Sequence, residues 1–198
     1  MDLWFWGRAY SGGDSSAVAD KLQEGVVQVV GNQLAFAAIK ADGSVVSWGD
    51  TYSGGDSSSV AAKLQEGVVQ VVGNRQSVAA MKADGSVVSW GDADSGGDSF
   101  LVADKLQEGV VQVVGNRQSF AAIKDDGSVV SWGDAASGGD SSLVADKLQA
   151  GVVQVVGNQL AFAAIKDDGS VVSWGRAASG GRSSSVAAKL QKGVVQVA

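Results

Sequence analysis

The chain has 198 residues, a formal net charge of −6, and no Cys, His or Pro. Without Cys there are no disulfides or thiolate metal sites, and without His the commonest general base and metal ligand is missing. The acidic balance argues against a nucleic-acid partner. No apolar run approaches the roughly 18 residues of a membrane span, and we expect no membrane association. The first residues resemble no secretion signal, so the compartment is not indicated.

One block of sequence returns every 42 residues along the whole chain. A Trp-Gly pair recurs at this step, and so does a Gly-Gly pair. The Trp residues are Trp6, Trp48, Trp90, Trp132 and Trp174, and the first glycines of the Gly-Gly pairs are Gly12, Gly54, Gly96, Gly138 and Gly180. A fixed period of this length predicts a repeat array, here five units in a single domain over residues 1–198.

The unit that starts at Gly25 predicts three strands in chain order. Val26–Val30 is β-branched and apolar at most positions, which favours a strand buried on both faces. Phe36–Lys40 is the second predicted strand, and its small Ala residues indicate a tightly packed inner position. Asp42-Gly43 is a strong hairpin signal, because both residues can take positive φ. Ser44–Trp48 is then the third strand of an antiparallel meander.

A Gly- and Ser-rich loop over residues 50–59 follows the meander. After it, Val60 and Leu64 lie one helical turn apart, serines precede them as candidate N-caps, and Gly67 can end a helix. These signals predict a short helix over residues 60–66. An irregular fourth strand is the alternative.

The apolar strand, the Ala-Ile-Lys-x-Asp-Gly-Ser-Val-Val-Ser-Trp-Gly run and the Gly-rich loop together resemble the regulator-of-chromosome-condensation repeat family. The resemblance covers nearly the whole chain. It implies a mostly β fold in which five units form a propeller-like toroid. An open β-solenoid with a short helix per turn is the alternative architecture.

The two ends of the chain do not complete the period. Ala198 aligns with Val30 and Met1 aligns with Gly43, so a closed five-unit ring would lack one strand of the Phe36–Lys40 type. Unpaired strand edges recruit other strands. The candidate binding residues are therefore those of the two end strands: Leu3, Trp4, Phe5, Val194, Val195 and Val197.

The end units also differ in charge from the interior ones. Arg176 and Arg182 stand where interior units have Asp, and Lys192 stands where three units have Glu. An acidic body with a basic last unit would attract the first unit of the same chain or of another molecule.

Other residue clusters have structural explanations that we favour over chemical ones. The Gly54–Ser58 loop and its copies could offer oxygens to a metal or amides to a phosphate, but turn and capping chemistry explains them better. The serines lack a His partner, so a hydrolase is unsupported. The Trp column could form a ligand site, although core packing is the simpler explanation. We expect no enzyme activity, no cofactor and no metal.

The sequence thus favours a non-enzymatic repeat scaffold for protein binding or self-assembly through its end strands. A homo-oligomer is compatible with this hypothesis. The alternative is a lectin-like module with one equivalent small-ligand site per unit. The near-identity of the units fits recent amplification or deliberate design.

Overall fold

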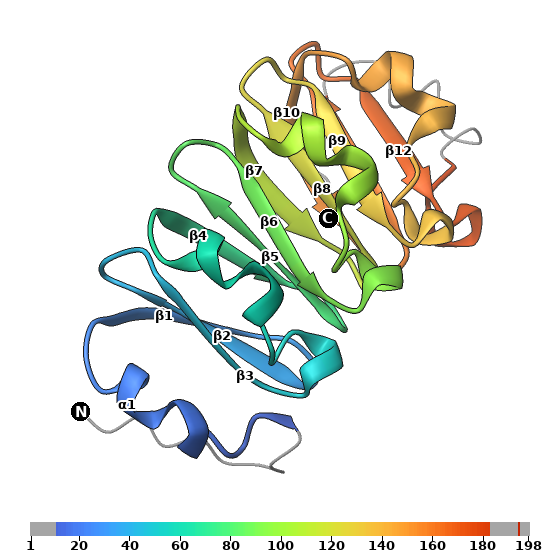
Figure 1. Ribbon diagram of the computed structural model, residues 1–198. Coiled ribbons are helices and arrows are strands. Elements are labelled where there is room, and N and C mark those ends of the chain that lie inside the picture. Colours follow the sequence, from blue (N-terminus) through green and yellow to red (C-terminus); the bar gives the residue numbers. More distant parts are fainter. Residues whose placement is uncertain (1–10, 183–193, 195–198) are drawn as a thin grey trace.

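The computed structural model describes residues 11–182 and Val194, and Figure 1 shows its elements in sequence colours. These residues form four three-stranded antiparallel sheets, one per unit. The strands are β1 (Val26–Gly31), β2 (Ala35–Lys40), β3 (Val45–Gly49), β4 (Val68–Gly73), β5 (Ser77–Lys82), β6 (Val87–Gly91), β7 (Val110–Gly115), β8 (Ser119–Lys124), β9 (Val129–Gly133), β10 (Val152–Gly157), β11 (Ala161–Lys166) and β12 (Val171–Gly175).

Each sheet is a meander in which the second strand lies between the first and the third. In the first sheet, Val29 pairs with Ala38 and Ala38 pairs with Val46. The predicted three-strand unit and its antiparallel order are therefore confirmed. The predicted inner strand is the central strand of each sheet, with residues buried on both faces.

The prediction that the first strand is buried on both faces is wrong. The register between β1 and β2 shifts between Val26 and Gln28, and Val27 is 64% exposed. Such a bulge inserts an extra residue and turns its side chain away from the regular alternation. The same irregularity recurs in all four sheets, so one valine per unit faces solvent despite its apolar character.

Short helices connect the sheets. They are η2 (Ser16–Val18), α1 (Ala19–Leu22), η3 (Thr51–Ser53), η4 (Ser58–Leu64), η5 (Ala93–Ser95), η6 (Phe100–Leu106), η7 (Ala135–Ser137), η8 (Ser142–Leu148) and η9 (Ala177–Ser179). The predicted helix is thus present, but η4 is a 3₁₀ helix. Serine capping is wrong as well: Ser57 makes no capping bond, whereas Asp56 Oδ1 accepts the amide of Ser58 at 2.8 Å.

The Asp-Gly hairpin is present with a different backbone from the one predicted. Gly43 has φ +76°, but no described residue other than glycine has positive φ. The Gly43 amide donates to the Lys40 carbonyl at 2.9 Å, and the Lys40 amide donates to Ser44 at 2.9 Å. This is a three-residue loop with glycine at the left-handed position. A Cβ at Gly43 would also lie 2.5 Å from the Gly67 nitrogen, so the next unit requires glycine here too.

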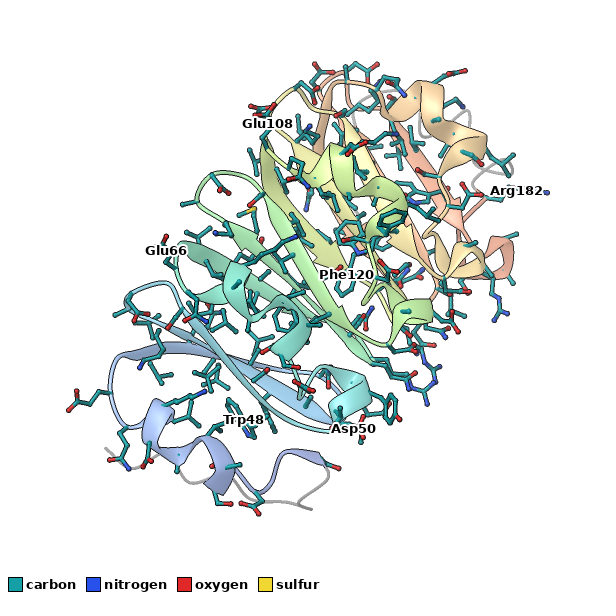
Figure 2. All side chains as sticks on the ribbon, in the orientation of Figure 1. Trp48, Asp50, Glu66, Glu108, Phe120 and Arg182 are labelled. Carbon is teal, nitrogen blue, oxygen red and sulfur yellow. The ribbon has the colours of Figure 1, made fainter. Side chains whose placement is uncertain are left out.

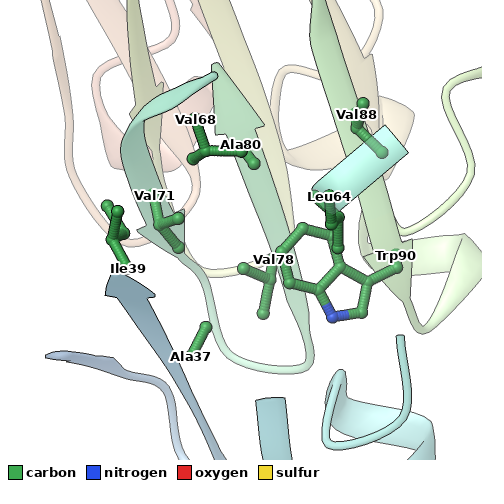
Figure 3. Close-up of a cluster of buried hydrophobic side chains, with 9 residues drawn as sticks. All are labelled: Ala37, Ile39, Leu64, Val68, Val71, Val78, Ala80, Val88 and Trp90. Carbon is green, nitrogen blue, oxygen red and sulfur yellow. The ribbon is translucent and has the colours of Figure 1, made fainter. Parts of the chain in front are cut away.

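The hydrophobic core lies between successive sheets. Figure 3 shows one cluster, to which β2 contributes Ala37 and Ile39 while β5 contributes Val78 and Ala80. Trp90 and Leu64 complete it from β6 and η4. Alternate residues of the central strand therefore face the sheet before and the sheet after it, and each interior unit is covered on both sides by its neighbours.

The sheets approach one another most closely along their first strands. β1 contacts β4, β4 contacts β7, and β7 contacts β10. A Cβ at Gly157 would lie 2.9 Å from the Gly115 carbonyl oxygen. At the opposite edge, the third strands pack on helices instead: η4 on β6, η6 on β9 and η8 on β12. The units are therefore wedges, narrow at the first strands and wide at the helices.

Candidate functional site at the unit interfaces

Because Trp and Gly-Gly keep a constant spacing along the chain, the same contact forms at each described interface between units. The indole Nε1 of Trp90 donates to the Gly54 carbonyl at 2.9 Å, and Trp132 donates to Gly96 at 3.0 Å. Trp48 and Trp174 repeat the bond with Gly12 and Gly138. Each Trp thus covers the loop that precedes its own unit.

A second aromatic ring reinforces this contact in three of the units. Phe120, labelled in Figure 2, stacks on Trp132 with ring centroids 5.4 Å apart. A Cβ at Gly96 would lie 2.9 Å from Phe120 Cδ2. Glycine at this position therefore allows the stack to seat directly on the backbone.

The prediction that the Trp column packs in the core is confirmed. Trp90 is 2% exposed, and Trp48, Trp132 and Trp174 are similarly buried. Aromatic platforms that bind sugars need an open ring face. The tryptophans of the described units are buried, so they do not form the ligand site that the Trp column could have offered.

An asparagine in each unit holds the same loop from the other side. Asn116 Nδ2 donates to the Ser137 carbonyl at 2.6 Å, while its Oδ1 accepts the amides of Gln118 and Ser119. Asn32, Asn74 and Asn158 make the equivalent bonds. From the sequence alone, Gly31-Asn32 and its copies predict only a turn. Asn recurs at this position in all four described units, and this recurrence is the sequence feature that could have indicated a structural role beyond the turn.

The loop of the last described unit lacks the cover that the others have. Gly96 and Gly138 are buried, but Gly180 is exposed, and a Cβ there would meet only Asn158 Nδ2 at 3.9 Å. Asn158 is exposed as well, whereas Asn74 and Asn116 are buried. Among the described residues, no Trp therefore covers the loop Arg176–Gly181. We call this loop the acceptor surface, because its backbone could accept a Trp bond as the other loops do.

The charge of this loop is reversed relative to the interior loops. Arg176 and Arg182 replace the Asp134 and Asp140 of the unit before, and both are exposed. Figure 2 shows Arg182 at the far end of the molecule. The acceptor surface is basic in an otherwise acidic protein.

Most of the predicted binding residues lie outside the described residues: Leu3, Trp4, Phe5, Val195 and Val197. Val194 is described, and its amide donates to the Gly169 carbonyl at 3.1 Å. The same bond starts the first strand of each later unit, as from Val152 to Gly127 at 2.9 Å. Val194 therefore occupies the position at which a further first strand would begin.

The aspartates of the loops and hairpins are engaged by local turns. Asp42 Oδ1 accepts the hydroxyl of Ser44 at 2.7 Å and its amide at 2.9 Å. These bonds, the one to the side chain foremost, lower the pKa of Asp42, and those of Asp84, Asp126 and Asp168 in the same way. Within the described ranges, no group of three Asp or Glu gathers as metal ligands, and no helix there has the length and apolarity to span a membrane.

No model of a known protein family matches the sequence. No curated protein matches it.

Solved structures do match the fold. Human WBSCR16 superposes with a TM-score of 0.55 at 20% identity, covering 76% of this chain and 47% of that one. Prp20p from Saccharomyces cerevisiae gives a TM-score of 0.55 at 18% identity, covering 88% and 51%. Yeast RCC1 bound to Kap60 gives 0.51 at 16% identity, covering 76% and 42%.

These likenesses concern the fold alone, because the identities are low. The chain spans about half the length of the solved structures it matches. Together with the four repeated sheets, they confirm the predicted resemblance to repeat β-propellers of the RCC1 type.

Proposed function

We propose that the protein is a non-enzymatic repeat scaffold for protein binding, and that it forms a five-unit propeller-like toroid whose end units associate. The uncovered loop Arg176–Gly181 is the observation that carries the proposal. Every other such loop among the described units is covered by a Trp from the following unit. Because the loop Arg176–Gly181 has the same backbone as the others, we expect a Trp to cover it in the same way.

The wedge shape of the units supports a closed arrangement. Sheets that touch along their first strands and are held apart by helices at their third strands must curve around the first-strand side. The narrow edge packs backbone against backbone at Gly115 and Gly157. In a propeller, this edge lines the central axis.

The spacing of the repeats identifies the residue that would cover the loop Arg176–Gly181. Each Trp donates a hydrogen bond to the carbonyl of a glycine 36 residues earlier. The Trp that would bond Gly180 therefore falls at position 216. Five units of 42 residues make 210, and position 216 in a closed ring is then Trp6. The proposed closure places Trp6 on Gly180, within one molecule or between two.

The end strands complete the proposal. Val194 lies where a further first strand would begin, and the sequence places the apolar residues Leu3, Trp4 and Phe5 in the predicted strand that carries Trp6. Apolar strand edges left bare attract other strands. The two end strands therefore pair with each other or accept a strand from a partner.

Protein binding is supported by the proteins of similar fold. Prp20p was studied for its binding to Gsp1p and histones, and yeast RCC1 was crystallised bound to Kap60. The engagement of the loop aspartates in turn bonds supports a non-enzymatic role. No catalytic constellation is needed for the proposed scaffold.

The test of closure is the shape and mass of residues 1–198 in solution. Small-angle scattering with light-scattering mass should give a disc, either monomeric or as a closed dimer, and Trp6→Ala should open it into a longer particle. Tyr52→Ala is the control, since Tyr52 is an aromatic residue that is 81% exposed and lies outside the end strands and the Trp column. A monodisperse, rod-shaped monomer that Trp6→Ala leaves unchanged would refute the toroid.

A peptide with the sequence of residues 31–42 tests the strand slot separately. If the slot is vacant, the peptide binds and raises the melting temperature by mass action. If the end strands pair directly, it does not bind. A reversed-sequence peptide of equal composition is the control.

A further inference from the structure

A groove runs along the outer side of the third sheet. It has a volume of about 1170 Å³ and lies between the start of η6 and the start of η8, with β9 as its floor. Residues of η5, η6, β9, η7 and η8 line it, among them Phe100, Leu101 and Trp132. It is separate from the Arg176–Gly181 loop and from the end strands.

The groove contains large apolar side chains that folding does not require. Phe100 is 81% exposed and Leu101 is 96% exposed. In the unit before, the same positions are Ser58 and Ser59, and that unit has the same sheet and the same helix. Leu101 recurs as Leu143 in the next unit, but Phe100 is replaced by serine in both neighbouring units, at Ser58 and Ser142. An exposed Phe in place of Ser lowers solubility without adding to the core, so Phe100 is the residue that indicates a contact with another molecule.

The rim of the groove is acidic. Asp94, Asp98, Asp134 and Asp140 line it, against a single cation, Lys105. Asp94 is specific to this unit, because its equivalents are Tyr52 and Ala136. The departures from the repeat thus bring an extra negative charge and an aromatic side chain to one surface.

The floor of the groove carries an unpartnered polar atom. The Ser131 hydroxyl is buried and makes no hydrogen bond, as is also the case for the equivalent hydroxyls of Ser89 and Ser173. In the first unit, the equivalent Ser47 donates to Ser57 at 2.8 Å. A buried hydroxyl without a partner is unfavourable, and a ligand backbone that reached the floor would satisfy it.

We propose that this groove docks an extended protein segment in which an aliphatic or aromatic side chain is flanked by Lys or Arg. The apolar side chain packs against Phe100 and Leu101, and the cations face Asp94 and the other rim carboxylates. Charge complementarity selects a basic protein segment over an acidic one. This inference deepens the proposed protein-binding role, on which it rests, but it does not depend on ring closure.

The test is a selection from a random twelve-residue peptide library displayed on phage, panned on residues 1–198 and counter-selected on the Phe100→Ser, Leu101→Ser double variant. That variant restores the Ser58-Ser59 sequence of the unit before, and its melting curve should match the parent. Selected peptides should be basic and contain at least one large apolar residue. The double variant should bind them at least about tenfold more weakly, from the lost burial of two apolar side chains.

Two single variants sharpen the test. Asp94→Ala restores the residue of the next unit and should weaken binding about two- to threefold while reducing its salt dependence. Leu143→Ser removes an equally exposed leucine, 94% accessible, that does not line the groove, and should change nothing.

Several outcomes would overturn the proposal. These are peptides that bind the double variant as tightly as the parent, peptides without cationic residues, or no enrichment at all. Self-association that the double variant abolishes would identify a second copy as the occupant instead. Peptides that bind elsewhere would leave the protein-binding scaffold standing and remove only the groove, whereas a rod-shaped particle that binds the selected peptides would remove only the toroid.

Discussion

The loops at Gly96 and Gly180 have nearly the same backbone and opposite surroundings. Gly96 has φ +93° and lies buried under Phe120 and Trp132, whereas Gly180 has φ +90° and is exposed. Behind the first loop, the Asn74 side chain donates to the Ser95 carbonyl at 2.5 Å. Behind the second, the Asn158 side chain donates to the Ser179 carbonyl at 2.6 Å. The loop is therefore shaped by its own unit before any neighbour covers it, and the cover adds burial to a surface that already exists.

The largest expected effect comes from removing the cover of an interior loop. Trp132→Ala takes away a buried indole, its bond to Gly96 and its stack on Phe120, and should lower the free energy of unfolding by about 3–5 kcal/mol. Urea denaturation measures this, with Val153→Ala as a control at an exposed strand position. A loss no larger than that of the control would mean that the interface does not depend on its Trp.

The next effect compares the two glycines directly. Gly96→Ala combines left-handed strain with a clash against Phe120 and should cost about 2–4 kcal/mol. Among the described residues, a Cβ at Gly180 meets only Asn158 Nδ2, so Gly180→Ala should cost about 1–2 kcal/mol in an open chain and about as much as Gly96→Ala in the proposed closed ring. Thermal unfolding of the matched pair gives the difference. If Gly180→Ala is as costly as Gly96→Ala, the last loop is covered in solution, as the proposed closure requires.

The asparagine clamps should show the same contrast on a smaller scale. Asn116→Ala strands buried amides and the Ser137 carbonyl, and should cost about 1–3 kcal/mol. Asn158 makes the same bonds in an exposed setting. Asn158→Ala should therefore cost less in an open chain, where water replaces these bonds, and about as much as Asn116→Ala in the proposed closed ring. Hydrogen exchange at Ser119 and Ala161, whose amides the two side chains accept, reports the local effect.

The smallest expected effect is the pH dependence of stability that the hairpin aspartates cause. It should be the same in the unit of Asp126 and in the unit of Asp168. The bonds from Ser128 and Ser170 lower the pKa of Asp126 and of Asp168 below the ordinary value of 3.8. A lowered folded-state pKa stabilises the fold above the unfolded-state pKa, and this contribution is lost as the pH falls through the folded-state pKa. Melting temperatures should therefore decline on acidification below about pH 4, and Asp126→Asn and Asp168→Asn should reduce that decline equally. Unequal reductions would show that the hairpin turns of the two units are not equivalent.

The repeated pattern predicted the sheet correctly because strand, hairpin and Trp signals are local. It could not predict the bulge at Val27, since an extra residue in one strand depends on its pairing with β2. It also assigned helix capping to serine, although Asp56 supplies the oxygen. The Asn clamp was missed because its partner, the Ser95 carbonyl for Asn74, lies 21 residues further along the chain. The groove at Phe100 could be found only when exposure was known, because an apolar residue in a helix ordinarily indicates core.

The equal spacing of the interface contacts has a consequence for how such a protein changes length. Each Trp bonds a glycine 36 residues earlier in nearly identical surroundings. Deleting or duplicating 42 residues between interior units brings together two surfaces that already fit. Gain or loss of a whole unit would therefore keep each remaining interior interface intact while changing the number of units that the proposed ring has to close.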